Sequence, residues 1–379
     1  MSERSIIVYG ASGYTGELIC EDLVRRGIPF IAAGRNQGRL DELVGRLGDD
    51  ADVETRVVEH TAEGLRKMLE GTKVVVDTVG PFYTLGPAVV DAALDCGVHF
   101  IDTTGEQLYQ REMRDQYGQR FADAKLVLNT SCAYFWGPGA ALAEACLETE
   151  GVDSIEVIYM QENLQTVASL QSFLRMFRRK GVVKRDGQMV EATRGDVTAV
   201  DVPGLDHKRN AILLATGEPT WFIDDDRVRN IETRIVFQVA KTRSAAEVQA
   251  GLKSIIGVSD LGGAVLGDDR LENFMDWFVL QVKKDPPRED PESSGLLCVA
   301  RGTGPNGESS YAEMRSHGPY LVTGFIAAEV AQRCVEGKAV RFGYVSCGQA
   351  VGHREMLGAL EEGYGAKVKI SSGAVAEAG

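Results

Sequence analysis

The feature that most constrains this chain is a glycine-rich turn between an apolar strand and an amphipathic helix, all within the first 27 residues. The apolar run Ile6–Tyr9 predicts the strand. The helix is predicted over Thr15–Arg26, because Leu18, Ile19 and Leu23 fall on one face at helical spacing. A strand, a tight turn and a helix in this order form the opening unit of a layered α/β fold.

The turn carries Gly10, Gly13 and Gly16, a spacing typical of dinucleotide binding. Gly10 permits the tight turn, Gly13 lets the backbone approach a pyrophosphate, and Gly16 lets the helix pack close to its strand. Unpaired N–H groups and the positive end of the helix dipole favour a phosphate there. The predicted pyrophosphate contacts are Gly10, Ala11, Ser12, Gly13, Tyr14, Thr15 and Gly16.

Composition and charge narrow the class of protein. The chain has 379 residues, of which 44% are hydrophobic and 25% charged, enough for two globular domains. We find no leader-like or membrane-spanning apolar run, and therefore expect a cytoplasmic protein. Seven scattered cysteines without a C-x-x-C pair argue against disulfides and against a metal site. The net charge of −14 excludes nucleic acid and makes a membrane partner unexpected.

Strand and helix patterns divide the chain into three parts. Over residues 1–130, apolar strands alternate with helices, which predicts a doubly wound, Rossmann-type parallel sheet of about six strands. Over residues 131–317, runs such as Leu296–Arg301 and Ser309–Arg315 flank a glycine-rich turn and predict an α+β domain on a mainly antiparallel sheet. Residues 318–379 predict C-terminal helices that return to the first domain.

The end of the second strand indicates which nucleotide is bound. An acidic residue at that place binds the ribose of NAD, whereas an arginine accommodates the 2′-phosphate of NADP. This chain has Arg35 and Asn36 there, with Arg39 one turn later and no acid before Asp41. The guanidinium is a planar, permanently charged donor suited to phosphate. We therefore predict NADP as the cofactor, held at its 2′-phosphate by Arg35 and Asn36.

Four motifs together resemble the saccharopine dehydrogenase-like oxidoreductases, which include the trans-acting enoyl reductases. They are Gly10–Gly16, Ala33–Arg35, Gly80–Phe82 and Asp102–Glu106. The resemblance implies a cofactor domain, closed by the C-terminal segment, around an inserted sheet domain that carries substrate contacts and a homodimer interface. It also implies that the Gly-Pro-Phe turn lies against the nicotinamide. The further cofactor contacts expected on this basis are Val79, Gly80, Pro81, Phe82, Thr103, Gly105 and Glu106.

Several of these residues also have a purely structural interpretation. Pro81 and Phe82 suit a rigid turn and a buried ring, ahead of a helix predicted over Pro87–Cys96. Glu106 suits the first turn of a helix, where a carboxylate is favoured by the dipole. The aromatic segment 131–139 fits either the wall of an apolar pocket or the core of a domain junction.

A reductase also needs a proton donor near the reduced bond. Tyr83, Tyr134 and Cys132 are the catalytic candidates, because each follows a predicted strand on the cofactor side. A phenol or thiol acts at neutral pH only in a perturbed environment, so a structural role is favoured for each of the three taken singly.

The first hypothesis is an NADP(H)-dependent oxidoreductase that reduces a C=C or C=N bond of a small, apolar substrate. A second is a Cys132-dependent reductase of acyl phosphates, because the glycine turn and Asn129–Cys132 also resemble N-acetyl-glutamyl-phosphate reductases. A third is a non-catalytic NADP-binding scaffold or sensor. For that reading, the basic, amphipathic segment Leu170–Arg179 is either a contact helix for a membrane or partner or a solvated basic face.

Overall fold

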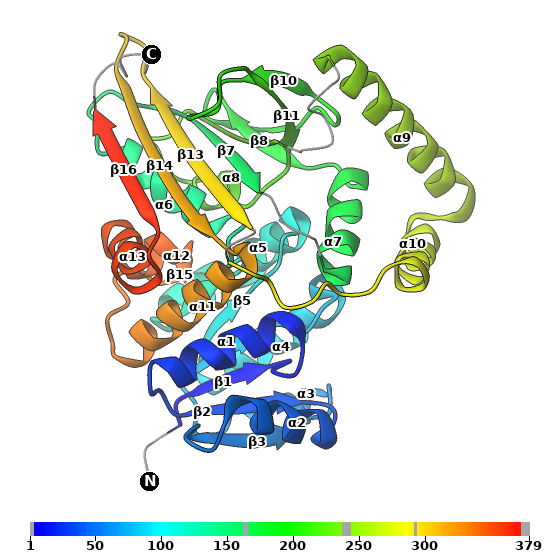
Figure 1. Cartoon of the computed structure of the whole chain (residues 1–379), viewed down its shortest axis with the longest axis vertical. Helices are drawn as coiled ribbons and strands as arrows, with labels where there is room; N and C mark the ends of the chain where they lie inside the picture. The colour runs from blue at the N-terminus through cyan, green and yellow to red at the C-terminus, as the bar shows by residue number, and fades with distance from the viewer. Residues whose placement is uncertain (1–3, 162–165, 237–243, 292–293, 373–379) are drawn as a thin grey trace. The chain divides into compact units, whose positions relative to one another are not determined.

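The computed structural model describes residues 4–161, 166–236, 244–291 and 294–372 (Figure 1). The chain forms two compact units, and it passes between them more than once. The first unit comprises Met1–Thr104, Tyr109–Ala141 and Pro319–Ala366. The second comprises Gly105–Leu108, Leu142–Gly318 and Lys367–Gly379.

The first unit is built on a seven-stranded sheet with the order β15-β6-β5-β4-β1-β2-β3, in which every pairing is parallel. All of the strands therefore end at the same edge, where a doubly wound sheet binds its ligands. The strands are β1 (Ile6–Tyr9), β2 (Phe30–Gly34), β3 (Val53–Val57), β4 (Val74–Asp77), β5 (His99–Asp102), β6 (Val127–Asn129) and β15 (Gly343–Tyr344).

Helices pack on both faces of this sheet. One face forms a continuous apolar core with α3, α4 and α5, in which alternate strand residues such as Ile7, Val75 and Phe100 are fully buried. On the other side, α11 packs against α1 and contacts β1, β4 and β5. The helices are α1 (Tyr14–Arg25), α2 (Gln37–Leu47), α3 (Ala62–Leu69), α4 (Phe82–Cys96), α5 (Gln107–Asp123), α11 (Pro319–Val335), α12 (Cys347–Val351) and α13 (His353–Ala359), followed by the π-helix η2 (Leu360–Tyr364).

The second unit is built on a nine-stranded sheet. Its main path runs β10-β11-β12-β7-β13-β14-β16, and β8 and β9 form a hairpin attached to β12. The β7–β12 pair is parallel and the other pairs are antiparallel. The strands are β7 (Ser154–Gln161), β8 (Val182–Arg185), β9 (Gln188–Glu191), β10 (Val197–Val200), β11 (Arg209–Leu214), β12 (Asn230–Val236), β13 (Gly295–Thr303), β14 (Ser309–His317) and β16 (Lys367–Ser372).

Helices of the second unit include a long pair, α9 and α10, that packs against α7. Among the described residues, no helix combines the length and the hydropathy that crossing a bilayer requires. These helices are α7 (Val167–Arg178), α8 (Glu218–Trp221), α9 (Ala245–Leu266) and α10 (Asp268–Val282), while α6 (Gly137–Cys146) leads from the first unit into the second.

The predicted fold class is confirmed: a Rossmann-type parallel sheet and a second, mainly antiparallel sheet. The first sheet has a seventh strand, because Gly343–Tyr344 pairs with β6. The helix predicted from Pro87 begins at Phe82. The units divide near residues 141 and 318, where the sequence suggested 130 and 317, and the last described strand belongs to the second sheet.

Candidate functional site

The glycine turn of the first unit adopts the geometry that its spacing predicts. Gly10 has φ +87°, a conformation that favours glycine, and a Cβ there would lie 2.5 Å from the Thr78 hydroxyl oxygen. A Cβ on Gly16 would lie 2.3 Å from the Gly10 carbonyl oxygen, so only glycine lets α1 approach β1 this closely. Gly13 is exposed at the tip of the turn. The glycines at positions 10 and 16 therefore allow close packing of the turn against β4 and of α1 against the turn.

The N-terminus of α1 is shaped to receive an anion. Its N-cap residue is Gly13, which has no side chain to accept hydrogen bonds from the first N–H groups of the helix. The turn itself is fixed from the other side, because the N–H groups of Gly10 and Ala11 both donate to the Ala33 carbonyl at 2.9 and 3.1 Å. These residues therefore fit a pyrophosphate at this position.

Arg35 follows β2 directly, at the same edge of the sheet as the glycine turn, and its side chain is exposed. The Arg35 cation lies close enough to influence the pKa of two side chains, Tyr9 at the end of β1 and His60 in the loop after β3. The Tyr9 hydroxyl lies 3.1 Å from His60 Nδ1. Burial and the Arg35 cation lower the pKa of His60, which keeps the imidazole neutral. Arg35 is thus an exposed cation at this edge of the sheet, and its contact with a 2′-phosphate stays a prediction.

Asn36 caps a helix, in addition to its predicted contact with the 2′-phosphate. It is the N-cap of α2, and its side-chain oxygen accepts a hydrogen bond from the Arg39 N–H at 3.1 Å. The cap positions the first turn of α2 and with it Arg39, which is exposed close to Arg35 in the sequence. We keep the role of Asn36 toward NADP as a prediction.

The turn after β4 lies beside the glycine turn, because β4 pairs with β1 in the sheet. Val79 and Phe82 pack against the core, whereas Gly80 and Pro81 are exposed. The Phe82 ring is partly buried, with its centroid 6.3 Å from that of Tyr109, and the contact of this turn with the nicotinamide stays a prediction. Tyr83 lies in the first turn of α4 with 38% of its surface exposed.

A pair of buried carboxyls that the motifs did not reveal lies beneath these turns. Asp77 and Asp102 end the neighbouring strands β4 and β5 and are register partners, and neither is exposed to solvent. Burial raises the pKa of Asp102 to about 7. Burial and, to a lesser extent, the charge of Asp102 raise the pKa of Asp77. The sequence pattern that indicates this pair is an aspartate at the end of each of two apolar strands.

The carboxyl pair holds the surrounding loops in place. Asp77 Oδ1 accepts a hydrogen bond from the Val79 N–H at 2.8 Å. Asp102 Oδ1 accepts from the N–H groups of Thr104 and Ser131, each at 2.9 Å. The two carboxyls therefore connect the turns after β4, β5 and β6 at the edge where the cofactor is expected.

Tyr134 and Cys132 are buried in the first unit, with 2% and 0% of their surfaces exposed. Burial raises the pKa of the Cys132 thiol well above its usual range, so the thiol stays protonated and is a poor nucleophile. The Tyr134 N–H donates to the Thr323 hydroxyl at 3.0 Å. These environments favour the packing interpretation of the segment around Tyr134 over an exposed catalytic role.

The Thr-Gly-Glu motif is divided between the units. Thr103 belongs to the first unit and is partly exposed, whereas Gly105 and Glu106 belong to the second. Glu106 is buried, where its Oε1 accepts hydrogen bonds from Arg175 at 3.2 Å and Ser172 at 3.3 Å. This carboxylate is therefore neutralised by an arginine within its own unit, and its contact with a cofactor stays a prediction.

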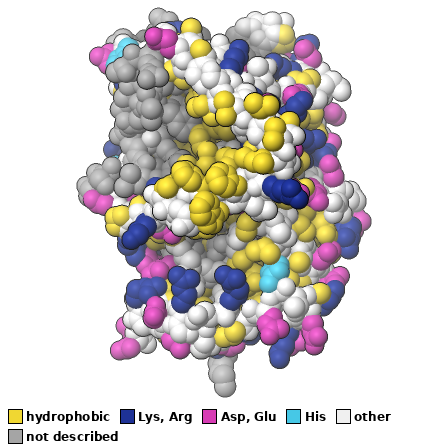
Figure 2. Space-filling view, turned by 90° about the vertical axis from the view of Figure 1, so that its right-hand side faces the viewer, with side chains coloured by type: hydrophobic (Ala, Val, Ile, Leu, Met, Phe, Trp, Pro, Cys, Tyr) yellow, Lys and Arg dark blue, Asp and Glu magenta, His cyan; other side chains and the backbone are white. Residues whose placement is uncertain are grey.

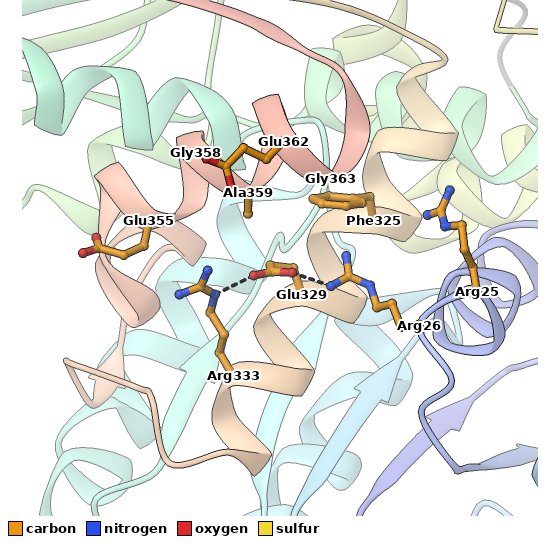
Figure 3. Close-up of a pocket in the computed structure, with 10 residues that line it drawn as sticks. All are labelled: Arg25, Arg26, Phe325, Glu329, Arg333, Glu355, Gly358, Ala359, Glu362 and Gly363. Atoms are coloured by element: carbon orange, nitrogen blue, oxygen red, sulfur yellow. Dashed lines mark hydrogen bonds and ion pairs between the residues drawn. The ribbon is translucent and has the colours of Figure 1, made fainter.

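An open pocket of about 680 Å³ in the first unit is unrelated to the glycine turn (Figure 3). Its charges are largely paired: Glu329 binds both Arg26 and Arg333, and the Arg26 guanidinium stacks 4.5 Å from the Phe325 ring centroid. Arg26 follows the C-terminal end of α1, the end opposite the glycine turn. The pocket therefore does not belong to the nucleotide site. No metal-binding cluster occurs among the described residues.

Comparison with known protein families gives two matches. Residues 6–120 match the saccharopine dehydrogenase NADP binding domain, which confirms NADP as the predicted cofactor. Residues 138–369 match a family of unknown function, DUF5938.

Comparison with individual proteins confirms the predicted resemblance. The chain is 31% identical over 144 residues to a lipid droplet localized protein of Caenorhabditis elegans, covering 35% of this chain and 34% of the relative. It is 30% identical over 136 residues to a trans-acting enoyl reductase of Mycobacterium tuberculosis, covering 35% and 32%. The matches thus span about a third of these relatives' lengths. Apo saccharopine dehydrogenase (L-Glu forming) of Saccharomyces cerevisiae shares the fold, with a TM-score of 0.62 and 12% identity over 98% of this chain and 100% of that one.

Proposed function

We propose that this chain, which belongs to the DUF5938 family of unknown function, is an NADP(H)-dependent oxidoreductase that reduces a C=C or C=N bond of a small, apolar substrate. The observation that carries the proposal is the glycine turn with Arg35 at the same edge of the parallel sheet, within the matched NADP-binding domain. The likeness to trans-acting enoyl reductases supports a C=C bond as the first substrate class to test.

Different residues of the first unit would bind different parts of NADPH. The segment Gly10–Gly16 would bind the pyrophosphate at the N-terminus of α1, while its Gly10 and Ala11 N–H groups stay bonded to the Ala33 carbonyl. Arg35 would bind the 2′-phosphate. The turn Val79–Phe82 would orient the nicotinamide half. When bound, NADPH supplies a hydride to one atom of the double bond. The other atom then needs a proton.

We assign the proton to Tyr83. Of the three candidate donors it is the exposed one, and it lies in the first turn of α4, directly after the turn that would hold the nicotinamide. Tyr134 and Cys132 are buried and held by packing. In the proposed reaction the Tyr83 O–H bond breaks, a C–H or N–H bond forms on the substrate, and solvent returns a proton to the phenolate.

The first experiment is a titration of the purified chain with NADPH and NADH, followed by nicotinamide fluorescence. We expect binding that is selective for NADPH. NADPH oxidation is then measured with enones, enoyl thioesters and cyclic imines, using wild type and Tyr83→Phe. Turnover that falls at least tenfold in the variant, with unchanged NADPH affinity, supports both the reaction and the donor. Absence of binding to either nucleotide would overturn the proposal and favour a non-enzymatic role.

Cys132→Ser separates this reaction from the thiolate alternative. Because the Cys132 thiol is buried and protonated, we expect the variant to retain NADPH-dependent turnover. A thioester mechanism would lose essentially all activity, since a serine hydroxyl lacks the nucleophilicity of a thiolate.

A further inference from the structure

The helices α9 and α10 of the second unit expose an unusual amount of apolar surface. Ten large apolar side chains on them are at least 50% exposed. Figure 2, which views the molecule from the side that carries these helices, shows hydrophobic side chains gathered across that face. The ten are Ile255, Val258, Leu261, Val265, Leu266, Phe274, Trp277, Phe278, Leu280 and Val282, and we call them the apolar face. A patch of this kind marks an interaction surface.

The apolar residues lie on one side of each helix. On α9, Ile255, Val258 and Val265 follow at helical spacing and are 65%, 74% and 73% exposed. On α10, Phe274, Trp277 and Phe278 form an aromatic cluster, with the Phe274 ring centroid 5.9 Å from that of Trp277 and 6.4 Å from that of Phe278. Both helices thus direct a hydrophobic stripe away from their own unit.

Three acidic residues of α10 pair with arginines of α7 and its C-terminal end. Arg178 binds Asp268 at 2.7 Å and Glu272 at 2.8 Å, and Arg179 binds Glu272 at 2.6 Å. Arg175 pairs with Asp276. The basic face of α7, which the sequence left open as a solvated face or a contact surface, is therefore occupied by α10.

On α9 the acidic Asp260 likewise pairs with Arg194, at 2.7 Å. An ordinary surface helix turns its apolar stripe toward the core and its charged residues toward water. In α9 and α10 the apolar stripe is exposed instead. The pair exposes hydrocarbon, while Asp260, Asp268, Glu272 and Asp276 are paired with arginines. Such an arrangement is stabilised only when something apolar covers the outer face.

The border of the apolar face carries positive charge. Arg270 precedes Phe274 by one helical turn and so lies on the same side of α10, and Lys283 and Lys284 follow the helix directly. Within the described part of the chain, these three cations make no ion pair with a carboxylate. A local excess of positive charge in a chain of net charge −14 is complementary to anionic headgroups.

We propose that the apolar face of α9 and α10 docks onto an anionic lipid surface. Aromatic and aliphatic side chains would enter the boundary between headgroups and acyl chains, while Arg270, Lys283 and Lys284 bind lipid phosphates. A second copy of the chain fits less well, because a symmetric pairing brings the same cations together. The net charge of the chain predicts repulsion from membranes, but that prediction averages over the chain, and the border of the apolar face carries Arg270, Lys283 and Lys284.

Flotation with vesicles tests the proposal. The full chain is mixed at low salt with vesicles of phosphatidylcholine and phosphatidylglycerol, or of phosphatidylcholine alone, and centrifuged through a density gradient. We expect the protein to float with the mixed vesicles and several-fold less with phosphatidylcholine. Trp277→Glu combined with Phe278→Glu should abolish flotation, because a carboxylate at these exposed positions opposes insertion without disturbing the core.

The control is Val340→Glu, which likewise places a carboxylate at an exposed apolar residue (67%), outside α9 and α10. It should float like wild type. Lys283→Glu with Lys284→Glu should lower binding to mixed vesicles and leave the weaker binding to phosphatidylcholine unchanged. Loss of flotation in the Val340 variant as well would overturn a specific role for the apolar face.

Tryptophan fluorescence gives a second measurement that does not depend on flotation. The chain has three tryptophans, and Trp277 is 55% exposed while Trp136 and Trp221 are buried. Vesicles should therefore shift the emission to shorter wavelength through Trp277. Trp277→Phe should float normally and lose the shift.

The proposal is overturned by either of two results. One is failure of the wild-type chain to float with the mixed vesicles at low salt. The other is sedimentation of the lipid-free wild type as a stable dimer that the Trp277→Glu, Phe278→Glu variant converts to a monomer, since the apolar face would then be covered by a second copy.

Discussion

Single residues decide the cofactor preference, and Arg35 is the first to test. Its exposed guanidinium follows β2 and is the cation predicted to bind the 2′-phosphate. Arg35→Ala should weaken NADPH by about 1.5–3 kcal/mol, the contribution of a charge-assisted hydrogen bond, and leave NADH almost unchanged. Fluorescence titration measures both. Arg66→Ala, which removes a surface cation paired with Asp95, is the control and should alter neither affinity. Equal losses for the two nucleotides would contradict the assignment.

Asp102 should make stability depend on pH. Folding raises its pKa from the usual 3.8 to about 7, so the folded chain binds the proton more tightly than the unfolded chain. The resulting stabilisation is complete below the unfolded pKa and is lost as pH rises through the folded value. Wild type should therefore lose stability relative to Asp102→Asn across this range, by at most about 1.4 kcal/mol per pH unit.

Urea denaturation of wild type and Asp102→Asn at several pH values gives this difference directly. The asparagine oxygen can still accept from the N–H groups of Thr104 and Ser131, so the loops keep their anchor. Part of the change belongs to Asp77, whose own pKa is raised by burial and, to a lesser extent, by the neighbouring Asp102 carboxylate. A difference that stays constant with pH would show that Asp102 does not change its protonation on folding.

At the scale of elements, the approach of α1 to β1 depends on Gly16. Gly16→Ala would place a Cβ 2.3 Å from the Gly10 carbonyl oxygen, so the turn must move. We expect a loss of about 1–3 kcal/mol in unfolding free energy and a marked loss of NADPH affinity. Gly45→Ala in α2, where a Cβ meets nothing within 4 Å, should be neutral or slightly stabilising. Denaturation midpoints and NADPH titration of both variants check this.

The elements also show what a sequence can reveal. The strand-turn-helix around Gly10 and the site of Arg35 were predictable, because local turn chemistry fixes them. The Asp77–Asp102 pair was not inferred, since it arises from pairing of β4 with β5. The helices α9 and α10 were missed, although Ser244 and Glu247 form a capping box at the start of α9. Their apolar stripes resemble core helices, and only the structure shows that the stripes face outward.

At the scale of the whole molecule, the cysteines predict a simple chemical behaviour. All seven are free thiols, of which Cys96 is exposed and the other six are buried. A thiol reagent should therefore modify one residue rapidly in the native chain and seven after denaturation. Cys96→Ser should remove the rapid phase. If a second thiol reacts rapidly and Cys132→Ser removes that reaction, the result would instead support the thiolate mechanism.

The division of the first unit also has a consequence for synthesis. Residues 319–366 complete the first unit, because they supply β15 to its sheet and α11, which packs against α1. They are made long after residue 141 has left the ribosome. At typical elongation rates that interval is roughly 10–50 seconds. During it the apolar surface that α11 later covers is exposed on a nascent chain. Synthesis of the first unit begins at the start of the chain and ends only with residue 366. We therefore expect residues 1–141 to be the segment that needs chaperones.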